Sequence, residues 1–451
     1  MKRYLLLVFM VAALSLNAGA MTGDVNGDGT VNITDVNLVI NSILGGTYIA
    51  EADANHDGVV NISDVNQIIN IILTGAVIED DITPKDIVLD NSDLTEPAEV
   101  IPDDEDALDF GDYVENTVWA LTVRINFDGD SATVTGNPST VMVEIDGAHV
   151  TVTSAAKRVR YILTGTTPDG SIKFYSERKF QVQLAGVDIT NPHGAAINNQ
   201  CGKSFYLVLN GGTENTLRDG TEYTMVEDED QKAALFSEGQ ILVSGKGKLN
   251  VYSTGKHCIA SDDFIFVRPG CHLYLNSTSG HGIKAKDYVH IKGGVINMEI
   301  NADGAKGINC DSLVYITGGR TTIINSGTTK METDSLGNPV STGVAGVKAD
   351  CNMTMTGGIL NIKSTGNDAK GINVAEPFLF TGGEMNIVVT GRKATNDPKG
   401  VKCDTDCTIQ GGSFYSCALH GLALDVEGTT TIADGYTTRN DADPRLLEII
   451  Y

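Results

Sequence analysis

The sequence predicts an all-β main domain, a right-handed parallel β-helix that forms a solenoid of about ten coils, preceded by a small α-helical module. One phrase recurs in the second half of the chain: G-I/V-K/N-x-D, a short apolar alternation, then Gly-Gly, starting at Gly307, Gly346 and Gly400. Glycines that follow strand-like runs recur at intervals that mostly lie between 21 and 29 residues. Because a unit this short cannot bury its own apolar face, it must stack on copies of itself.

Successive copies place apolar residues in the same columns, which is what parallel coils stacked in register produce. The predicted inward pairs are Val289/Ile291, Val314/Ile316, Met353/Met355, Phe378/Phe380 and Cys407/Ile409. Copies of 22 to 25 residues leave no room for a βαβ crossover and lack the frame of a leucine-rich repeat. A propeller blade needs roughly 40 residues or more. A parallel β-helix is the remaining architecture that fits these copies.

The first twenty residues have the pattern of an export signal, with Lys2 and Arg3 before an apolar core and Ala18-Gly19-Ala20 after it. No later apolar run approaches the roughly 20 residues that span a bilayer. A net charge of −26 argues against nucleic acid and anionic lipid as partners. We therefore expect a secreted, extracellular monomer with no membrane span.

The eight cysteines all follow residue 200 and are expected to be mostly free thiols, although export would also permit disulfides.

Two loops near the N-terminus carry oxygen-bearing side chains at positions 1, 3, 5, 9 and 12, with Gly at position 6. This is the pattern that binds calcium, which takes six to eight oxygen ligands. Position 7 would contribute its backbone carbonyl. The predicted ligands are Asp24, Asn26, Asp28, Thr30, Asn32 and Asp35 in the first loop, and Asp53, Asn55, Asp57, Val59, Asn61 and Asp64 in the second.

Each loop is followed by one short amphipathic stretch, residues 36–44 and 65–73, with no entering helix and with Asp at position 12. In these features residues 23–75 resemble the type I dockerin, a calcium-folded module that binds cohesin domains. The resemblance implies a cohesin partner on a scaffold protein, selected in part by Ile33-Thr34 and Ile62-Ser63 at loop positions 10 and 11. A calcium-stabilised spacer without a partner is the alternative.

The expected domain organisation is a signal peptide at residues 1–20, the dockerin-like module at 21–75 and an acidic linker at 76–112. The linker has fourteen acidic residues against one base, Lys85, and too little apolar periodicity to pack on its own. The β-helix is expected at residues 113–440, with a C-terminal tail at 441–451.

Acidic and basic residues also recur in columns along the predicted turns of the β-helix. The candidate metal- or ligand-binding acids are Asp303, Asp311, Asp350, Asp368, Asp397 and Asp404. The candidate ligand-binding lysines are Lys284, Lys306, Lys348, Lys370, Lys399 and Lys402. These columns have two interpretations. One is a ladder of surface ion pairs, each worth about 0–1 kcal/mol. The other is a groove in which calcium and lysines engage an acidic, repeating polymer.

The run LNGGTENTLRDG, followed by ALFSEGQILVSGKGKLNV and the repeated KGI-x-x-D…GG, is similar to a family of secreted, calcium-containing parallel β-helix proteins. The similarity covers residues 119–425. It implies binding of plant cell-wall polysaccharide, namely polygalacturonate (pectin) and cellulose. Family members usually have two acids before the G-I, whereas this chain has Lys306, Lys370 and Lys399 in place of the second.

Two other functions stay open at this point. A calcium-dependent pectate lyase has the same fold and needs a Lys or Arg as its base, but the Asp-Lys pairs recur evenly instead of gathering at one place. A structural or adhesive surface protein would use the β-helix only as a rigid support. No catalytic residue is assigned, and His257, His281 and His420 are expected to be solvated turn residues.

Overall fold

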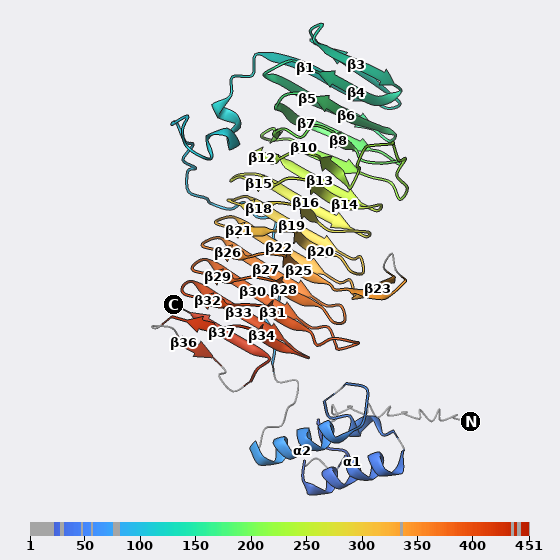
Figure 1. The fold of residues 1–451 in the computed structure, drawn as a ribbon, viewed down its shortest axis with the longest axis vertical. Helices are drawn as coiled ribbons and strands as arrows, with labels where there is room; N and C mark the ends of the chain where they lie inside the picture. Colours follow the sequence, from blue (N-terminus) through green and yellow to red (C-terminus); the bar gives the residue numbers. More distant parts are fainter. Residues whose placement is uncertain are drawn as a thin grey trace, which may run out of the picture. The chain divides into compact units, whose positions relative to one another are not determined.

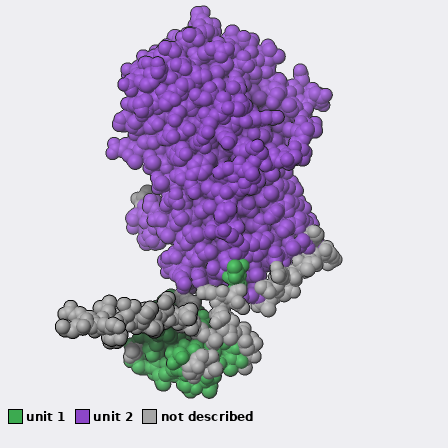
Figure 2. Space-filling model, turned by 180° about the vertical axis from the view of Figure 1, so that it is seen from behind, with its two compact units in different colours: residues 1–83 green, residues 84–451 purple. Residues whose placement is uncertain are grey.

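The computed structural model describes residues 22–27, 31–46, 48–55, 57–74, 82–333, 337–433, 437–439 and 443–450. The predicted signal peptide and the predicted calcium ligands Asp28 and Thr30 lie outside these residues. The chain divides into two compact units, Met1–Thr83 and Pro84–Tyr451 (Figure 2). Among the described helices none is both long and apolar enough to cross a membrane.

The first unit contains the helices α1 (Ile33–Gly45), η1 (Ala50–Ala52) and α2 (Ile62–Thr74). The expected helices are confirmed, and each begins three residues earlier than predicted because the last positions of each loop form its first turn. At α1 the side chain of Asn32 accepts a hydrogen bond from Thr34 N–H and completes a capping box with Asp35. Gly46, in the left-handed conformation, ends the helix. A small core joins the two helices: Val36, Val39, Ala52, Ala54, Val65 and Ile68.

The second unit is the predicted parallel β-helix, in which each coil adds one strand to each of three parallel ladders (Figure 1). One ladder is a twelve-stranded sheet, and its β4 to β34 are all parallel, so the described solenoid has eleven turns where the sequence predicted about ten. Its strands are β3 (Val141–Asp146), β4 (Ala148–Ser154), β6 (Gly170–Ser176), β8 (Ile197–Asn199), β11 (Ala233–Ser237), β14 (His257–Ser261), β17 (Ile283–Ala285), β20 (Lys306–Cys310), β25 (Ala345–Ala349), β28 (Lys370–Val374), β31 (Lys399–Cys403) and β34 (Leu422–Val426).

The other two ladders belong to one 23-stranded sheet. Both start at its long strand β7, whose first half pairs with β9 and whose last residues pair with β10. Ladder 1 comprises β9 (Phe205–Leu209), β12 (Ile241–Gly245), β15 (Ile265–Val267), β18 (Tyr288–Ile291), β21 (Leu313–Ile316), β26 (Met353–Met355), β29 (Phe378–Phe380), β32 (Cys407–Ile409) and β35 (Thr430–Ile432). Ladder 2 comprises β10 (Glu214–Arg218), β13 (Lys248–Ser253), β16 (His272–Ser277), β19 (Val295–Ile300), β22 (Arg320–Asn325), β27 (Ile359–Ser364), β30 (Glu384–Val389) and β33 (Ser413–Ala418).

The remaining strands close the ends of the solenoid or form an insertion. They are β1 (Leu121–Asp128), β2 (Ser131–Thr135), β5 (Val159–Thr167) and β7 (Phe180–Thr190) at the first coils, the hairpin β23 (Lys330–Thr333) and β24 (Pro339–Thr342), and β36 (Thr437–Arg439) and β37 (Leu446–Ile450) at the last. Residues 446–450, which the sequence assigned to a tail, thus form a strand that pairs antiparallel with β33.

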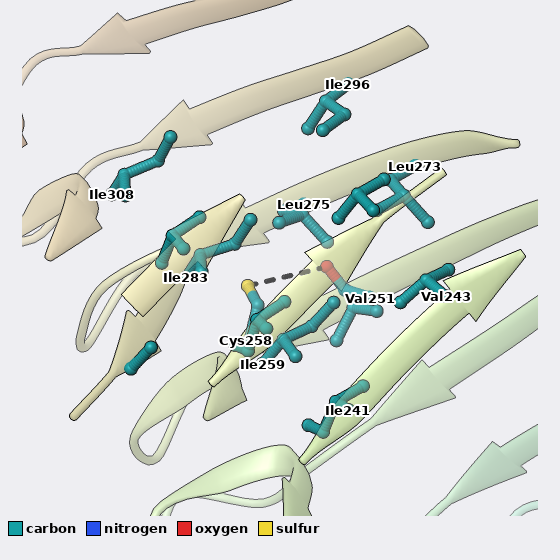
Figure 3. Packing of buried hydrophobic residues seen from close by; sticks show 14 of the residues in the cluster. Ile241, Val243, Val251, Cys258, Ile259, Leu273, Leu275, Ile283, Ile296 and Ile308 are labelled. Atoms are coloured by element: carbon teal, nitrogen blue, oxygen red, sulfur yellow. Dashed lines mark hydrogen bonds between the residues drawn. The ribbon is translucent and has the colours of Figure 1, made fainter. Parts of the chain in front are cut away.

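The apolar columns predicted from the repeat lie inside the solenoid. Each of the five predicted inward pairs is at most 1% exposed. Isoleucines and valines of the twelve-stranded sheet form a further buried column, in which Ile283, Ile308 and Val347 stand in register. Figure 3 shows part of this core, where Cys258 Sγ lies 3.7 Å from the carbonyl oxygen of Val251. All eight cysteines are free, as expected, and seven of them are buried.

Glycines of the repeated phrase are required by close packing. Gly307, Gly346 and Gly371 are the second residues of β20, β25 and β28, and a Cβ atom there would lie 2.2–2.5 Å from an isoleucine Cγ2 of ladder 2. The second Gly of each Gly-Gly pair has a positive φ, for example 81° at Gly358, which lets the chain turn from ladder 1 into ladder 2. The glycines therefore set the coil cross-section.

The acidic segment differs from the expected linker from Pro84 onward. Residues 84–101, here called the strap, have no regular secondary structure and run across successive strands of ladder 2 through side-chain contacts. The segment continues into η2 (Phe110–Asp112) and η3 (Val114–Asn116), drawn in light blue beside β12 (Figure 1). Cationic side chains of the β-helix supply the partners that the strap's own sequence lacks.

We expect Gly371→Ala to lower the free energy of unfolding of the β-helix by about 1–3 kcal/mol, the usual cost of overpacking. The added Cβ would lie 2.2 Å from Ile387 Cγ2 and 2.6 Å from the Gly400 carbonyl oxygen. The fluorescence of Trp119, the single tryptophan of the chain, reports on this unit during urea unfolding. The control is Gly202→Ala, which meets nothing within 4 Å. Equal unfolding midpoints for the two variants would contradict the packing argument.

Candidate functional site

The aspartate at position 12 of each N-terminal loop organises the loop through backbone hydrogen bonds. Asp35 accepts from Val25 N–H at 2.9 Å and Asn32 N–H at 2.9 Å. Asp64 accepts from Asn55 N–H at 3.2 Å and Asn61 N–H at 2.8 Å. Both carboxylates are fully buried. Position 12 therefore holds the start of the loop against the first turn of the helix that follows it.

The first position of each loop also carries a buried carboxylate. Asp24 and Asp53 are 8% and 6% exposed, and Asp53 accepts from the backbone N–H groups of Asp57 and Gly58. Residues 22–75 contain no Lys or Arg and a single His against the four buried carboxylates. Buried charge of one sign is costly without a counter-ion. The donor set, oxygens around a Gly-containing turn, fits calcium.

The six candidate lysines lie on the twelve-stranded sheet; we call them the lysine face. Lys284, Lys348 and Lys402 occupy one outward column, where they alternate with Asn309 and Asn373 on the intervening coils. Strands of neighbouring coils are about 4.8 Å apart, so lysines two coils apart are separated by roughly 10 Å. Lys306, Lys370 and Lys399 share a second column, at the start of β20, β28 and β31.

The lysines act on one another's protonation. Burial, followed by the nearby charges of Lys348 and Lys284, lowers the pKa of Lys306 to about 8. Burial, followed by the charge of Lys402, also lowers the pKa of Lys370. Lys306 is only 7% exposed, and its ammonium donates to the Gly304 carbonyl oxygen at 2.8 Å. The face is dense in positive charge where coils stack.

Three of the candidate acids pair with the outward lysines at the carboxyl ends of the strands. Lys284 contacts Asp311 of the next coil, whereas Lys348 and Lys402 contact Asp350 and Asp404 of their own coil. The three carboxylates are 40–46% exposed. Further pairs follow at the last coils, between Lys399 and Asp425 at 3.2 Å and between Lys402 and Glu427 at 3.2 Å.

The other three candidate acids lie before the strands and stabilise loops. Asp303 accepts from the N–H and hydroxyl of Thr328. Asp368, 2% exposed, accepts from Ala394, Thr395 and Asn396 and so orders the loop that follows β30. Asp397 pairs with Lys393 at 3.2 Å. Because a five-residue strand is roughly 16 Å long, the two columns of acids stand at opposite ends of the sheet and do not form one site.

Two clusters were missed by sequence reasoning. Among the described residues, Asp230, Glu238 and Asp262 are the one group of three or more Asp, Glu, His or Cys side chains close enough to share a cation. Lys232 already contacts Asp230 at 2.8 Å and Asp262 at 2.5 Å. The three acids are spread over 33 residues of the sequence, and their spacing carries no signal of their convergence. His257 and His281, expected to be solvated, are half-buried and stacked with ring centroids 4.5 Å apart.

The stacked histidines are held neutral. The Nδ1 atoms of His257 and His281 accept hydrogen bonds from the backbone N–H groups of His281 and Lys306. Burial lowers the pKa of His257 to about 4 and moves that of His281 well below its usual value, with Lys284 among the further causes. The histidines extend the lysine face toward the first coils without adding charge to it.

Lys306 should make the β-helix more stable as the pH rises. Between its folded pKa of about 8 and its unfolded pKa of about 10.4, the unfolded chain binds a proton that the native state lacks, so stability increases with pH. We expect Lys306→Met to remove this increment and to raise the urea midpoint at pH 7. The control is Lys157→Met, at an exposed lysine. Parallel pH profiles for wild type and Lys306→Met would contradict the assignment.

Calcium should control the folding of the first unit alone. Chelation is expected to abolish the helical circular dichroism of α1 and α2, because their core is small and binding at 100-fold excess over Kd stabilises by about 2.7 kcal/mol. The double variant Asp35→Asn/Asp64→Asn should lose the same signal at saturating calcium. Trp119 fluorescence is the internal control and should unfold at an unchanged urea concentration. Helical signal that is indifferent to chelator would overturn the calcium assignment.

Two family models match the chain. The model described as carbohydrate-binding domain-containing protein matches residues 146–444, and the dockerin type I domain model matches residues 22–73. A carbohydrate-binding domain-containing protein of Acetivibrio thermocellus is 27% identical over 156 residues, which are 33% of this chain and 52% of that protein, so the chain spans about half the relative's length.

A solved structure, described as the polysaccharide lyase-like protein from C. thermocellum in a gadolinium derivative, has a TM-score of 0.44 and 20% identity. It covers 70% of this chain and 98% of that chain. The first family model, by contrast, spans well over half of the chain and includes the whole lysine face. The protein therefore belongs to the family of carbohydrate-binding domain-containing proteins and carries a type I dockerin domain at residues 22–73.

Proposed function

We propose that this secreted, monomeric protein binds an acidic plant cell-wall polysaccharide, polygalacturonate (pectin) before cellulose, through the lysine face and does not cleave it. The calcium-loaded dockerin attaches it to a cohesin domain of a scaffold protein. The observation that carries the proposal is the column of Lys284, Lys348 and Lys402 in register on one face. A periodic row of cations is suited to a periodic, extended polyanion.

The charge state of the face favours an incoming anion. Burial and, after it, neighbouring lysines lower the pKa values of Lys306 and Lys370, so an approaching negative charge stabilises their protonated forms. Asp311, Asp350 and Asp404 hold the outward ammonium groups in place and are exposed enough to be solvated when ligand carboxylates take over part of their role. These three acids also stay the candidates for calcium that bridges protein and polymer.

The Asp and Lys side chains are distributed evenly along the β-helix, which agrees better with a binding role than with the single active site of a lyase. One observation favours a pectate lyase: Lys306, with a pKa of about 8, has the proton affinity of a general base. Its ammonium is buried and donates to Gly304 O, however, which keeps it from a substrate on the surface. The relative in Acetivibrio thermocellus is also described as carbohydrate-binding.

The dockerin exposes large apolar side chains that suit a protein partner. Ile33 and Ile62, at position 10 of the two loops, are 65% and 64% exposed, and Leu44 at the end of α1 is 80% exposed. Contact with a partner would remove such side chains from water, which is favourable. A cohesin that binds at the starts of the two helices would cover Ile33 or Ile62.

We expect Lys284→Ala/Lys348→Ala/Lys402→Ala to weaken binding to polygalacturonate about tenfold or more, since three ion pairs of up to about 1 kcal/mol each are lost. Retardation in a gel containing polygalacturonate measures this, and added salt should weaken wild type more than the variant. The control is Lys157→Ala/Lys203→Ala/Lys246→Ala, which removes the same charge at exposed positions elsewhere.

The same samples separate the alternatives. Ultraviolet absorbance from unsaturated uronate, produced with calcium present, would show a lyase and overturn the non-catalytic assignment. Equal retardation of both triple variants would overturn the lysine face as the binding site. Loss of wild-type retardation in chelator, with the β-helix still folded, would assign calcium to the ligand contact.

A further inference from the structure

The strap lies along a second row of polar side chains, on ladder 2 instead of the twelve-stranded sheet. At its start Lys85 donates to Asn386 Oδ1 at 2.9 Å, and Asp86 pairs with Lys363 at 3.3 Å. Farther along, Asn297 donates to the carbonyl oxygen of Asp90 at 2.9 Å. Over six residues the strap thus passes β30, β27 and β19, so it lies across the strands as an extended polymer would.

The acids of the strap each meet a basic side chain or a pair of backbone donors. Arg320 pairs with Asp90 at 3.1 Å, and His272 lies 3.4 Å from Asp93. Glu96 accepts from the N–H groups of Gly270 at 2.8 Å and Gly294 at 2.7 Å. Glu99 is held by Arg268 at 2.9 Å and by Lys292 at 3.3 Å. The surface beneath the strap is therefore built to take a row of carboxylates.

Polar contacts hold the strap in place, with little apolar packing. Within residues 84–101 only Ile87 is buried, and the segment forms no strand. The apolar contacts come later, where Val114 packs with Tyr206, Leu242 and Phe266.

The ion pairs along the strap differ in exposure. The carboxylates of Asp86, Asp90 and Asp93 are 79%, 45% and 97% exposed, and ion pairs this exposed are weak and sensitive to salt. Glu99 and Arg268 are only 12% and 4% exposed, so their pair belongs to the anchor. The strap is thus anchored at its C-terminal end and exchangeable along the rest of its length.

The strap also leaves hydrogen-bonding capacity unused on the surface beneath it. Asn297 and Arg320 are 1% and 8% exposed, yet Asn297 Oδ1 and Arg320 Nε have no hydrogen-bond partner among the described residues. Asn297 Oδ1 needs a donor and Arg320 Nε an acceptor. A sugar acid supplies both, a hydroxyl and a carboxylate. Asn386 and Asn361 continue the row, joined by a hydrogen bond of 2.9 Å.

Space for a ligand exists beside the strap. A cavity of about 610 Å³ lies between residues 94–100 and the turns of the β-helix, and its lining includes Glu96, Glu99, Lys292 and Thr317. This volume is within the range of small-molecule sites, about 300–1,000 Å³. The cavity adjoins the carboxylate positions of Glu96 and Glu99.

We propose that the surface beneath the strap is a second carbohydrate-binding site, for an extended acidic polysaccharide, and that the strap occupies it as an internal competitor. This proposal rests on the function proposed above only for the class of ligand, because the residues beneath the strap are different from those of the lysine face. Ligand and strap compete for the same cations, so apparent affinity rises with the fraction of molecules in which the strap has left.

The first test uses the full chain with a neutral strap: Asp86→Asn, Asp90→Asn, Asp93→Asn, Glu96→Gln and Glu99→Gln together. Polygalacturonate should bind this variant at least about tenfold more tightly than wild type. Adding Arg320→Gln and Lys363→Gln should remove that gain, whereas adding the lysine-face triple variant should leave it. A gain that survives Arg320→Gln/Lys363→Gln, or the absence of any gain in a folded variant, overturns the second site.

The second test uses the wild-type protein and so does not depend on the folding of a variant. Saturating polygalacturonate should speed amide hydrogen exchange in residues 86–100 as the strap leaves, and neutral dextran should not. Unchanged or slower exchange overturns the proposal. Release of the strap by polyglutamate but not by polygalacturonate would make the ligand an acidic peptide and also overturn it. If only the neutral-strap variant binds, the lysine-face function fails while the second site stands.

Discussion

The in-register stacking of short parallel coils is the constraint on which the rest of the protein depends. A coil of 22 to 25 residues has no interior of its own, so its apolar side chains are buried only when the coil above and the coil below supply theirs. Gly307, Gly346 and Gly371 show how tight this fit is, since a single Cβ atom at any of them would overlap a neighbouring isoleucine. The cross-section of every coil is thereby held nearly constant.

The register that lines up apolar residues inside also lines up like charges outside. Lys284, Lys348 and Lys402 stand in one column because they hold the same place in their coils. Burial, and after it the charges of these lysines, lowers the pKa values of Lys306 and Lys370. Repulsion between stacked cations is offset by aspartates at the ends of the strands. The same arrangement leaves a periodic cationic face, which is the basis of the proposed polysaccharide binding.

Carboxylates elsewhere in the chain are stabilised in two different ways. In the dockerin the buried carboxylates of Asp35 and Asp64 have no Lys or Arg in residues 22–75 to balance them, and this points to calcium. In the strap the carboxylates instead contact basic side chains and backbone N–H groups of ladder 2 and of the turns that lead into it. The net charge of −26 therefore conceals cationic surfaces, which are the places where an acidic polymer would bind.

The sequence alone determined what depends on local spacing: the coil period, the inward columns such as Met353 and Phe378, the two loops rich in Asp and Asn, and the helices that follow them. Each of these is set by residues within one repeat. Tertiary structure decided which side chains meet between repeats. Lys284 pairs with the next coil but Lys348 with its own, Asp368 orders a loop, and His257 stacks on His281. The strap shows most clearly what the sequence alone does not determine. Its acids have the composition of a solvated linker, because their partners Arg320 and Lys363 lie more than 200 residues away in the sequence. These partners come near only when the coils stack.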